Sequence, residues 1–312
     1  MILAGIDIGT NSLRLLIAEA GPDRLQKIYS DRKATRLGMD LDRTGTISRE
    51  AEGRALAALT HFADRIKYYE ACHVAAVGTS ALRNASNADV FLKHVQEETG
   101  LAVTVISGEE EARLTFLGVV HAGKAQWDKD CAASALVIDI GGGSTEMIAT
   151  SPGRKIISTS LSLGAVYLTE RFIKHDPPST GEIQRMRKSI RETLNQKQNE
   201  FEIPKNMACI GTAGTVSTLA AMDQRLVEYD PDKINGYILT RKSIHAITKQ
   251  LVQSTHAERS SFPGLEHGRE DIIATGTIIL EEIMLHFNFR HLHVSEGGLR
   301  EGLILDIYER YA

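Results

Sequence analysis

The sequence has few cysteines and no long apolar segment, and each shortage excludes a class of protein. Cys72, Cys131 and Cys209 have no CxxC spacing and no histidine pair that would complete a zinc site. We expect three buried thiols. No stretch approaches the roughly 18 apolar residues of a transmembrane helix, and no basic segment precedes the apolar N-terminus. We therefore expect a cytoplasmic protein, neither secreted nor membrane-bound.

An excess of positive charge is also lacking. The chain has 36 lysines and arginines against 40 acidic residues, a net charge of -4, so it lacks the field of a nonspecific nucleic-acid binder. Its 11 histidines include no HxxxH or HExxH pair, and we assign no role to His286, His291 and His293. With 312 residues and 42% hydrophobic residues, the chain has the length and composition of an ordinary globular protein of two domains.

Short apolar runs and helical patterns alternate along the chain. Three apolar runs separated by glycine-containing breaks predict a β-meander over the first thirty residues. Strands and helices then alternate, which indicates an α/β fold. The main expected helices are 48–70, 87–98, 108–121, 181–201, 241–252, 271–287 and a last one from Leu299, and the expected strands between them include 74–77, 102–106, 136–140 and 291–295.

The pattern of the first strand and its turn occurs a second time. Residues 136–145 repeat the order of residues 5–12: an apolar strand, one aspartate, then a glycine-bearing turn into another strand. Asp7 and Asp139 are 139 minus 7, or 132, positions apart, which indicates duplicated domains. The polar segment 122–133, with Trp127, is the expected boundary. We predict domain I at 1–124 plus 299–312 and domain II at 125–298.

Each repeated turn combines two features that suit phosphate chemistry. A strand that ends in aspartate and turns through glycine places a carboxylate beside backbone N–H groups, which together hold a phosphate and its Mg²⁺. A solvated aspartate in an ordinary hairpin is the alternative for either turn taken alone.

Three further side chains are candidates for chemistry, each with a plainer alternative. Glu111 has helical spacing to Leu114 and Gly118, so it faces the packed side and is a candidate general base. Acidic charge at a helix start is its alternative role. Glu146 lies beyond the triple-glycine turn, where it is either a Mg²⁺ ligand opposite Asp139 or a solvent-facing residue. Arg83 is expected on a short polar loop, where it either contacts phosphate or is an ordinary surface arginine.

The order of the motifs resembles that of the Ppx/GppA family, the exopolyphosphatases and guanosine pentaphosphate phosphohydrolases. The resemblance covers the whole chain. The motifs that carry it are GIDIGTNSLRLLIA (5–18), TRLGMDLDRTGTIS (35–48), GTSALRNASN (78–87), ISGEEEARLTFLGV (106–119), VIDIGGGSTEM (137–147), GTAGTVSTLA (211–220), PGLEHGREDIIATGTIIL (263–280) and SEGGLREGL (295–303).

The resemblance implies an α/β fold of duplicated actin-like ATPase (ribonuclease H-like) domains with the active site in the interdomain cleft. It implies Mg²⁺ as cofactor, with K⁺ as a candidate monovalent ion. The implied catalytic residues are Glu111, Glu146 and Asp139, and the implied metal ligands are Asp7, Asp139 and Glu146. The implied phosphate-binding residues are Gly9, Thr10, Asn11, Ser12, Arg83, Gly141, Gly142, Gly143, Ser144, Thr145 and Arg269.

The implied reaction is Mg²⁺-assisted attack of water on the terminal phosphate of polyphosphate or pppGpp. A homodimer is the expected assembly, without membrane or sequence-specific nucleic-acid partners. The chain ends at Ala312 and so resembles the short, two-domain form. Two other interpretations stay open: a kinase or ATPase of the actin-like superfamily, with an adenosine pocket near 211–215, and a noncatalytic sensor of polyphosphate or (p)ppGpp. The basic residues Arg32, Lys33 and Arg36 line either the substrate entry or a solvated face.

Overall fold

The computed structural model describes residues 1–22, 24–123, 134–153, 156–197, 201 and 207–312. Contacts within the chain divide it into two compact units. Unit 1 consists of Met1–His121 and Gly297–Ala312, and unit 2 of Ala122–Glu296. Among the described residues, no helix has the length and apolar character needed to cross a membrane.

Unit 1 is built on a five-stranded mixed sheet in the order β3-β2-β1-β4-β5. Its strands are β1 (Ile2–Ile8), β2 (Ser12–Gly21), β3 (Arg24–Ala34), β4 (His73–Gly78) and β5 (Val103–Val105). The first three form an antiparallel meander, and β4 and β5 add in parallel beside β1. The carboxyl ends of β1, β4 and β5 therefore meet at one edge of the sheet, where loops carry functional side chains.

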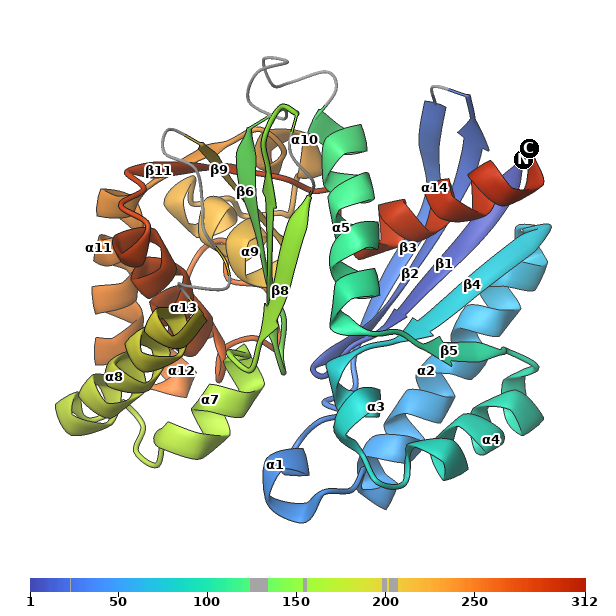
Figure 1. The fold of residues 1–312 in the computed structure, drawn as a ribbon. Helices are drawn as coiled ribbons and strands as arrows, with labels where there is room; N and C mark the ends of the chain where they lie inside the picture. Colours follow the sequence, from blue (N-terminus) through green and yellow to red (C-terminus); the bar gives the residue numbers. More distant parts are fainter. Residues whose placement is uncertain (23, 124–133, 154–155, 198–200, 202–206) are drawn as a thin grey trace. The chain divides into compact units, whose positions relative to one another are not determined.

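Helices cover both faces of this sheet (Figure 1). They are α1 (Leu41–Thr44), α2 (Arg49–Tyr68), α3 (Ser80–Asn84), α4 (Ala88–Thr99), α5 (Gly108–Gly123) and α14 (Leu299–Tyr311). The side chains of α2 and α4 pack with Ile6, Ile8 and Leu13 on one face. Those of α14 pack on the other face, against Leu3 and Leu16. Because side chains alternate along a strand, Asp7 shares the α14 face with Leu3.

Unit 2 repeats this arrangement around a six-stranded sheet in the order β10-β11-β9-β6-β7-β8. Its strands are β6 (Ala135–Ile140), β7 (Thr145–Thr150), β8 (Ile157–Leu161), β9 (Ala208–Thr212), β10 (Ile238–Thr240) and β11 (His291–Val294). An antiparallel meander β6-β7-β8 is again followed by a parallel strand, β9, beside the first. The sheet topology thus confirms the duplication that the sequence predicts.

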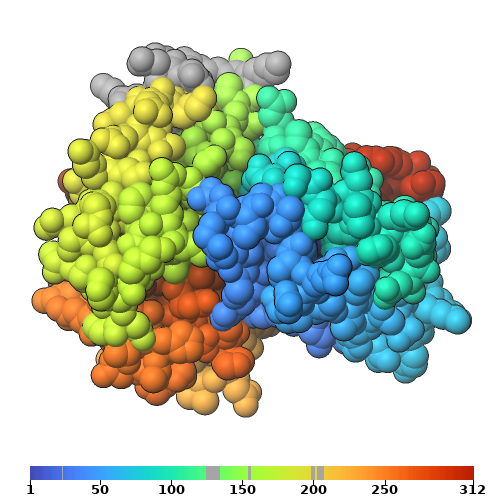
Figure 2. Space-filling view, turned by 90° about the horizontal axis from the view of Figure 1, so that it is seen from below, coloured from blue at the N-terminus to red at the C-terminus, as the bar shows by residue number. Residues whose placement is uncertain are grey.

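The helices of unit 2 enclose its main core. They are α7 (Ala165–Phe172), α8 (Thr180–Lys197), α9 (Ala213–Asp223), α10 (Pro231–Ile234), α11 (Arg241–Gln253), α12 (His256–Arg259) and α13 (Ile273–His286). Leu136, Ile138 and Ile140 of β6 belong to this core. Asp139 alternates with them, so it lies on the other face of the sheet. Surface residues of α7 and α8 are visible in yellow-green in Figure 2.

Most of the expected elements are present, with two corrections. Arg83 lies in the short helix α3 and not on a loop, because residues 80–84 form one helical turn with Arg83 N–H bonded to Thr79 O. Cys72 is exposed and not buried, because it lies just before the amino end of β4. Its Sγ donates to Ile2 O at 3.1 Å. Cys209 is buried, and burial raises the pKa of its thiol. Trp127 and Cys131 lie outside the described residues.

Candidate active site

A pair of carboxylates stands at the hairpin of unit 2. Asp139 on β6 and Glu146 on β7 are direct partners in the antiparallel register, so their side chains lie on the same face of the sheet. Glu146 is only 1% exposed, and the Ser160 hydroxyl of β8 donates to its Oε1 at 2.7 Å. Thr212 is the partner of Asp139 on the neighbouring strand β9. A polar row therefore crosses four strands.

The two carboxylates have the chemistry of a magnesium site. Like charges directly opposite each other on two strands repel, and a divalent cation between them removes that repulsion. Mg²⁺ is commonly held by one or two carboxylates, with water and substrate phosphate as its other ligands. Among the described residues, no group of three histidine, cysteine, aspartate or glutamate side chains forms a metal cluster. The donor set thus fits a cation shared with a phosphate substrate, and not a closed structural metal.

The turn between these carboxylates is held by its own carbonyl groups. Gly141 N–H donates to Ser144 O at 2.9 Å, which closes the turn. Gly141 O accepts from Ala165 N at 3.0 Å and Gly142 O from Val166 N at 2.8 Å, so the first residues of α7 fix the loop. Because a peptide is planar and trans, the N–H that follows each bonded carbonyl points the opposite way. The N–H groups of residues 142 and 143 are thereby turned away from α7, as an anion-binding turn requires.

The corresponding turn of unit 1 is closed by an equivalent hydrogen bond, but a different pair of its carbonyls is bonded. Gly9 N–H donates to Ser12 O at 3.2 Å, and the carbonyls of Thr10 and Asn11 accept from Gly38 N and Arg36 N at 2.9 and 2.8 Å. Asn11 is 7% exposed, and its Nδ2 has no hydrogen-bond partner among the described residues. A buried amide without a partner is costly unless a ligand completes it. A phosphate oxygen is a suitable acceptor.

Asp7 differs from Asp139 in its surroundings. Its register partner on β2 is Arg14, on the face covered by α14. Burial raises the pKa of Asp7, while the positive charges of Arg14 and Arg300 oppose that shift. The arginines of unit 1 therefore offset part of the cost of burying the Asp7 carboxylate, and burial has the larger effect.

The two candidates of unit 1 that the sequence treats separately are in contact. Glu111, in the first turn of α5, is 8% exposed, and its Oε2 accepts from Arg83 Nη1 at 2.7 Å. The same Nη1 donates to Ile106 O at 2.9 Å. The buried position of Glu111 agrees with its helical spacing. Its guanidinium neighbour holds the Glu111 carboxylate in one orientation.

Arg269 lies against the start of α9. A Cβ added to Gly214 would be 1.8 Å from Arg269 Nη2, so only glycine leaves space for the guanidinium. Arg269 is also paired with Glu266. On the other side of the loop, a Cβ at Gly211 would meet Leu292 and Val216 at 2.3 and 2.9 Å. Side chains thus fill the space beside residues 211–215, and this packing does not favour an adenosine pocket there.

Sequence reasoning missed two residues of this region. Ser160 positions Glu146, and Gly164 lies so close to the turn that a Cβ would be 2.2 Å from Gly142 O. Neither has a local sequence signal, because a strand serine and a loop glycine are common. The segment that follows the third strand of unit 1 shows the same feature, with Gly38 against Thr10. An alignment of the two repeats that extends past the third strand of each would have paired Gly164 with Gly38 and so identified it.

These features define a class of protein: a two-unit α/β protein in which each unit has an aspartate before a glycine turn. The family model described as the Ppx/GppA phosphatase family matches residues 16–311. Exopolyphosphatase 2 of Mycobacterium tuberculosis is 33% identical over 98% of both chains. A guanosine-5'-triphosphate,3'-diphosphate pyrophosphatase of Pseudoalteromonas translucida is 31% identical over 97% of this chain and 58% of its own length.

Solved structures agree with the family model. An exopolyphosphatase from Cytophaga hutchinsonii has a TM-score of 0.88 and 30% identity, over 100% of this chain and 99% of its own. An Aquifex aeolicus member of the Ppx/GppA family has a TM-score of 0.80 and 33% identity, over 100% and 99%. The chain belongs to the Ppx/GppA phosphatase family. The family and the duplicated α/β fold class expected from the sequence are confirmed.

Proposed function

We propose that this phosphatase releases the terminal phosphate of inorganic polyphosphate, or converts pppGpp to ppGpp, by attack of water on the terminal phosphorus. The observation that carries the proposal is the carboxylate pair Asp139 and Glu146 at an anion-binding turn. The names of the relatives support both substrates. A homodimer and a cytoplasmic location stay predictions from the sequence. The proposal requires residues of both units to act on one phosphate group.

Each part of the chemistry has a candidate residue. Asp139 and Glu146 would hold Mg²⁺, which when bound supplies positive charge to the phosphate oxygens. The N–H groups of the two turns, with Arg269, would orient the terminal phosphate. Glu111 would accept a proton from the attacking water while Arg83 fixes its carboxylate. The phosphorus–oxygen bond to the next phosphate then breaks, and the leaving oxygen keeps the electron pair.

The proposal is tested by Glu111→Gln, with Glu110→Gln as the matched control. Glu110 is on the same helical turn and binds Arg113 at the surface. We expect Glu111→Gln to lower kcat by about 10³-fold on short polyphosphate, long polyphosphate or pppGpp, within the range of a lost general base, and Glu110→Gln to leave it within about twofold. Phosphate release is measured, with ADP assayed in parallel on ATP.

Three outcomes would contradict the proposal. Undiminished cleavage by the Glu111→Gln protein would exclude Glu111 as the base. Release of ADP, with no phosphate from polyphosphate or pppGpp, would favour the kinase interpretation. Binding of substrate without phosphate release by the unmodified protein would favour a sensor. The relative rates on the four substrates rank polyphosphate against pppGpp.

A further inference from the structure

Unit 2 has a basic cavity of about 710 Å³ that none of the proposed catalytic residues lines. It lies among α8, α11, α13 and the turn before β11. Nine residues line it: Arg187, Arg191, Thr240, Arg241, Lys242, His245, Glu281, Leu285 and Arg290. Five of the nine are arginine or lysine, and one is acidic. Such an excess of positive charge in a concave surface attracts anions.

Two of the arginines are held in place by buried carboxylates of α13. Arg187 donates to both Glu281 and Glu282, the second at 2.5 Å. Arg191 Nε donates to Glu282 Oε2 at 2.6 Å. Glu281 is also 2.6 Å from His245 Nδ1. Guanidinium groups fixed in this way lose little side-chain entropy when a ligand binds.

The other three cationic side chains of the cavity are not paired with a carboxylate among the described residues. Among the described residues, no ion pair involves Arg241, Lys242 or Arg290. The first two occupy the first turn of α11, which has no acidic residue and whose N-terminus adds partial positive charge. Counting Arg187 and Arg191 as neutralised by Glu281 and Glu282, the cavity keeps three full positive charges.

The cavity lies at the opposite end of the sheet from the carboxylate pair. Arg290 and Thr240 are at the amino end of β11, where Thr240 pairs with His291. Asp139 and its partner Thr212 are near the carboxyl ends of β6 and β9, and β9 is parallel to β11. The cavity is therefore separated from Asp139 by the length of these strands.

We propose that this cavity is a second anion-binding site, which takes the phosphate chain of an oligophosphate. Three uncompensated charges suit a ligand with several phosphates better than a single phosphate. Among the described lining residues, no phenylalanine, tyrosine or tryptophan offers a surface for base stacking, which disfavours RNA. The site binds the chain without cleaving it, since it contains no carboxylate pair like that of Asp139 and Glu146.

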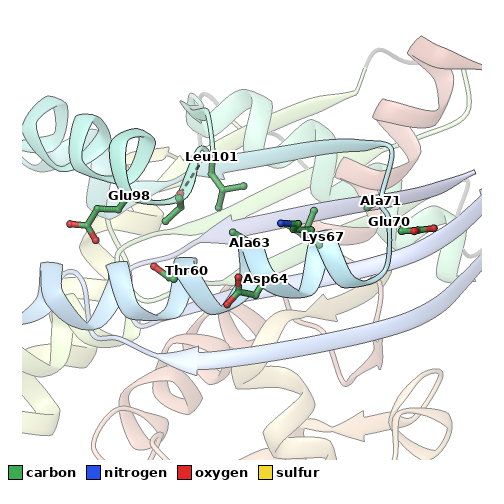
Figure 3. Close-up of a pocket in the computed structure, with 10 residues that line it drawn as sticks. Thr60, Ala63, Asp64, Lys67, Glu70, Ala71, Glu98 and Leu101 are labelled. Carbon is green, nitrogen blue, oxygen red and sulfur yellow. Dashed lines mark hydrogen bonds between the residues drawn. The ribbon is translucent and has the colours of Figure 1, made fainter.

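A second cavity, on unit 1, shows that an excess of positive charge is not common to the cavities of this protein. The pocket of about 580 Å³ on α2 and the end of α4 is lined by Asp64, Glu70 and Glu98 against one cation, Lys67 (Figure 3). It has comparable size and the opposite balance of charge. Lys67 is exposed, as Lys242 is, and it is therefore a matched internal control.

The test is the rate at which an amine-reactive ester modifies each lysine, measured by mass spectrometry of the full chain. The probe is imidotriphosphate, which resists hydrolysis, in EDTA so that metal-dependent binding does not contribute. We expect saturating probe to slow modification of Lys242 by about tenfold and to leave Lys67 unchanged. In Arg241→Gln/Arg290→Gln, the probe concentration that gives half-protection should rise by about tenfold.

The controls separate this site from the proposed active site. The double variant should keep the kcat of the unmodified protein on a short substrate, and Lys27→Gln/Lys93→Gln, which removes two exposed lysines, should keep the protection of Lys242. GTP should protect Lys242 at the same concentration as imidotriphosphate, because only the phosphates are recognised. Equal modification of Lys242 with and without probe would overturn the proposal. Stronger protection by a short single-stranded RNA, per phosphate, would also overturn it.

Discussion

The two hairpins of this protein have the same backbone and opposite electrostatics. In both, aspartate is the next-to-last residue of the first strand, and the residue directly opposite on the second strand follows seven positions later. In unit 1 that residue is Arg14, and in unit 2 it is Glu146. One hairpin therefore has an aspartate opposite an arginine, whereas the other has two carboxylates opposite each other on adjacent strands.

From this difference we expect separate roles for the two copies. Arg14 places a positive charge opposite Asp7, whereas Asp139 and Glu146 place two carboxylates opposite each other. Mg²⁺ is commonly held by one or two carboxylates, so we expect it at the hairpin of unit 2 before that of unit 1. Asp7 as a metal ligand stays a prediction. The duplication supplied two glycine turns after an aspartate, and the residue opposite that aspartate has the opposite charge in the two units.

The largest expected effect is that of Glu146→Gln on turnover. Glutamine keeps the acceptor for Ser160 but removes one of the two charges. We expect a loss of about 10³-fold in phosphate release, the size of a lost metal contribution of several kcal/mol. In addition, Mg²⁺ should raise the Tm of the unmodified protein and leave that of the variant unchanged. A Tm increase of equal size in both would show that Mg²⁺ binds elsewhere.

Arg14→Glu converts the first hairpin into a copy of the second. It removes the partner of Asp7 and places a like charge opposite it, so we expect the free energy of unfolding to fall by about 3–5 kcal/mol. Urea unfolding in EDTA measures the effect. Arg24→Glu is the control, because Arg24 is an exposed residue 4.0 Å from Glu19, and its change should be below about 1 kcal/mol. Equal effects of the two substitutions would remove the distinction between the hairpins.

Gly164 and Gly38, which pack against the two turns, should differ in how much stability is lost when each is replaced by alanine. A Cβ at Gly164 would be 2.2 to 2.4 Å from the backbone of residues 142 and 143, whereas a Cβ at Gly38 would meet the Thr10 side chain. Backbone cannot move aside as a side chain can. We therefore expect Gly164→Ala to cost about 2–3 kcal/mol and Gly38→Ala about 1 kcal/mol, by thermal unfolding. Gly53→Ala on α2, with open space around it, should stabilise.

The smallest effect concerns the pH dependence of stability. Because the pKa of Asp7 is raised in the folded state, the native protein binds this proton more tightly than the unfolded chain. Its contribution to stability is therefore favourable at low pH and is lost as pH rises from the ordinary carboxyl range through the folded pKa. In urea unfolding between pH 4 and 7, the free energy of unfolding should fall less steeply with rising pH for Asp7→Asn than for the unmodified protein. The exposed control Asp64→Asn should match the unmodified protein, and identical slopes for Asp7→Asn would contradict the shift.

Much of the fold was predictable because its signals are local. Apolar runs, glycine breaks and the spacing of Asp7 and Asp139 predicted the meanders and the duplication. The expected helix 48–70 is present as α2, and Ser48 is its N-cap, with its Oγ accepting from Ala51 N at 3.2 Å. The short helix α3 was not predicted, because one helical turn has no periodicity to detect and depends on its tertiary contacts.

The candidate site divides in the same way. Sequence alone determined the candidate residues, an aspartate before each glycine turn and a glutamate at a helix start, because these patterns are local. Only the tertiary structure decided their partners. The contact of Glu111 with Arg83, the position of Arg14 opposite Asp7, and the basic cavity around Arg241 and Arg290 join residues from separate elements. Such pairings depend on register and packing, which no short stretch of sequence specifies.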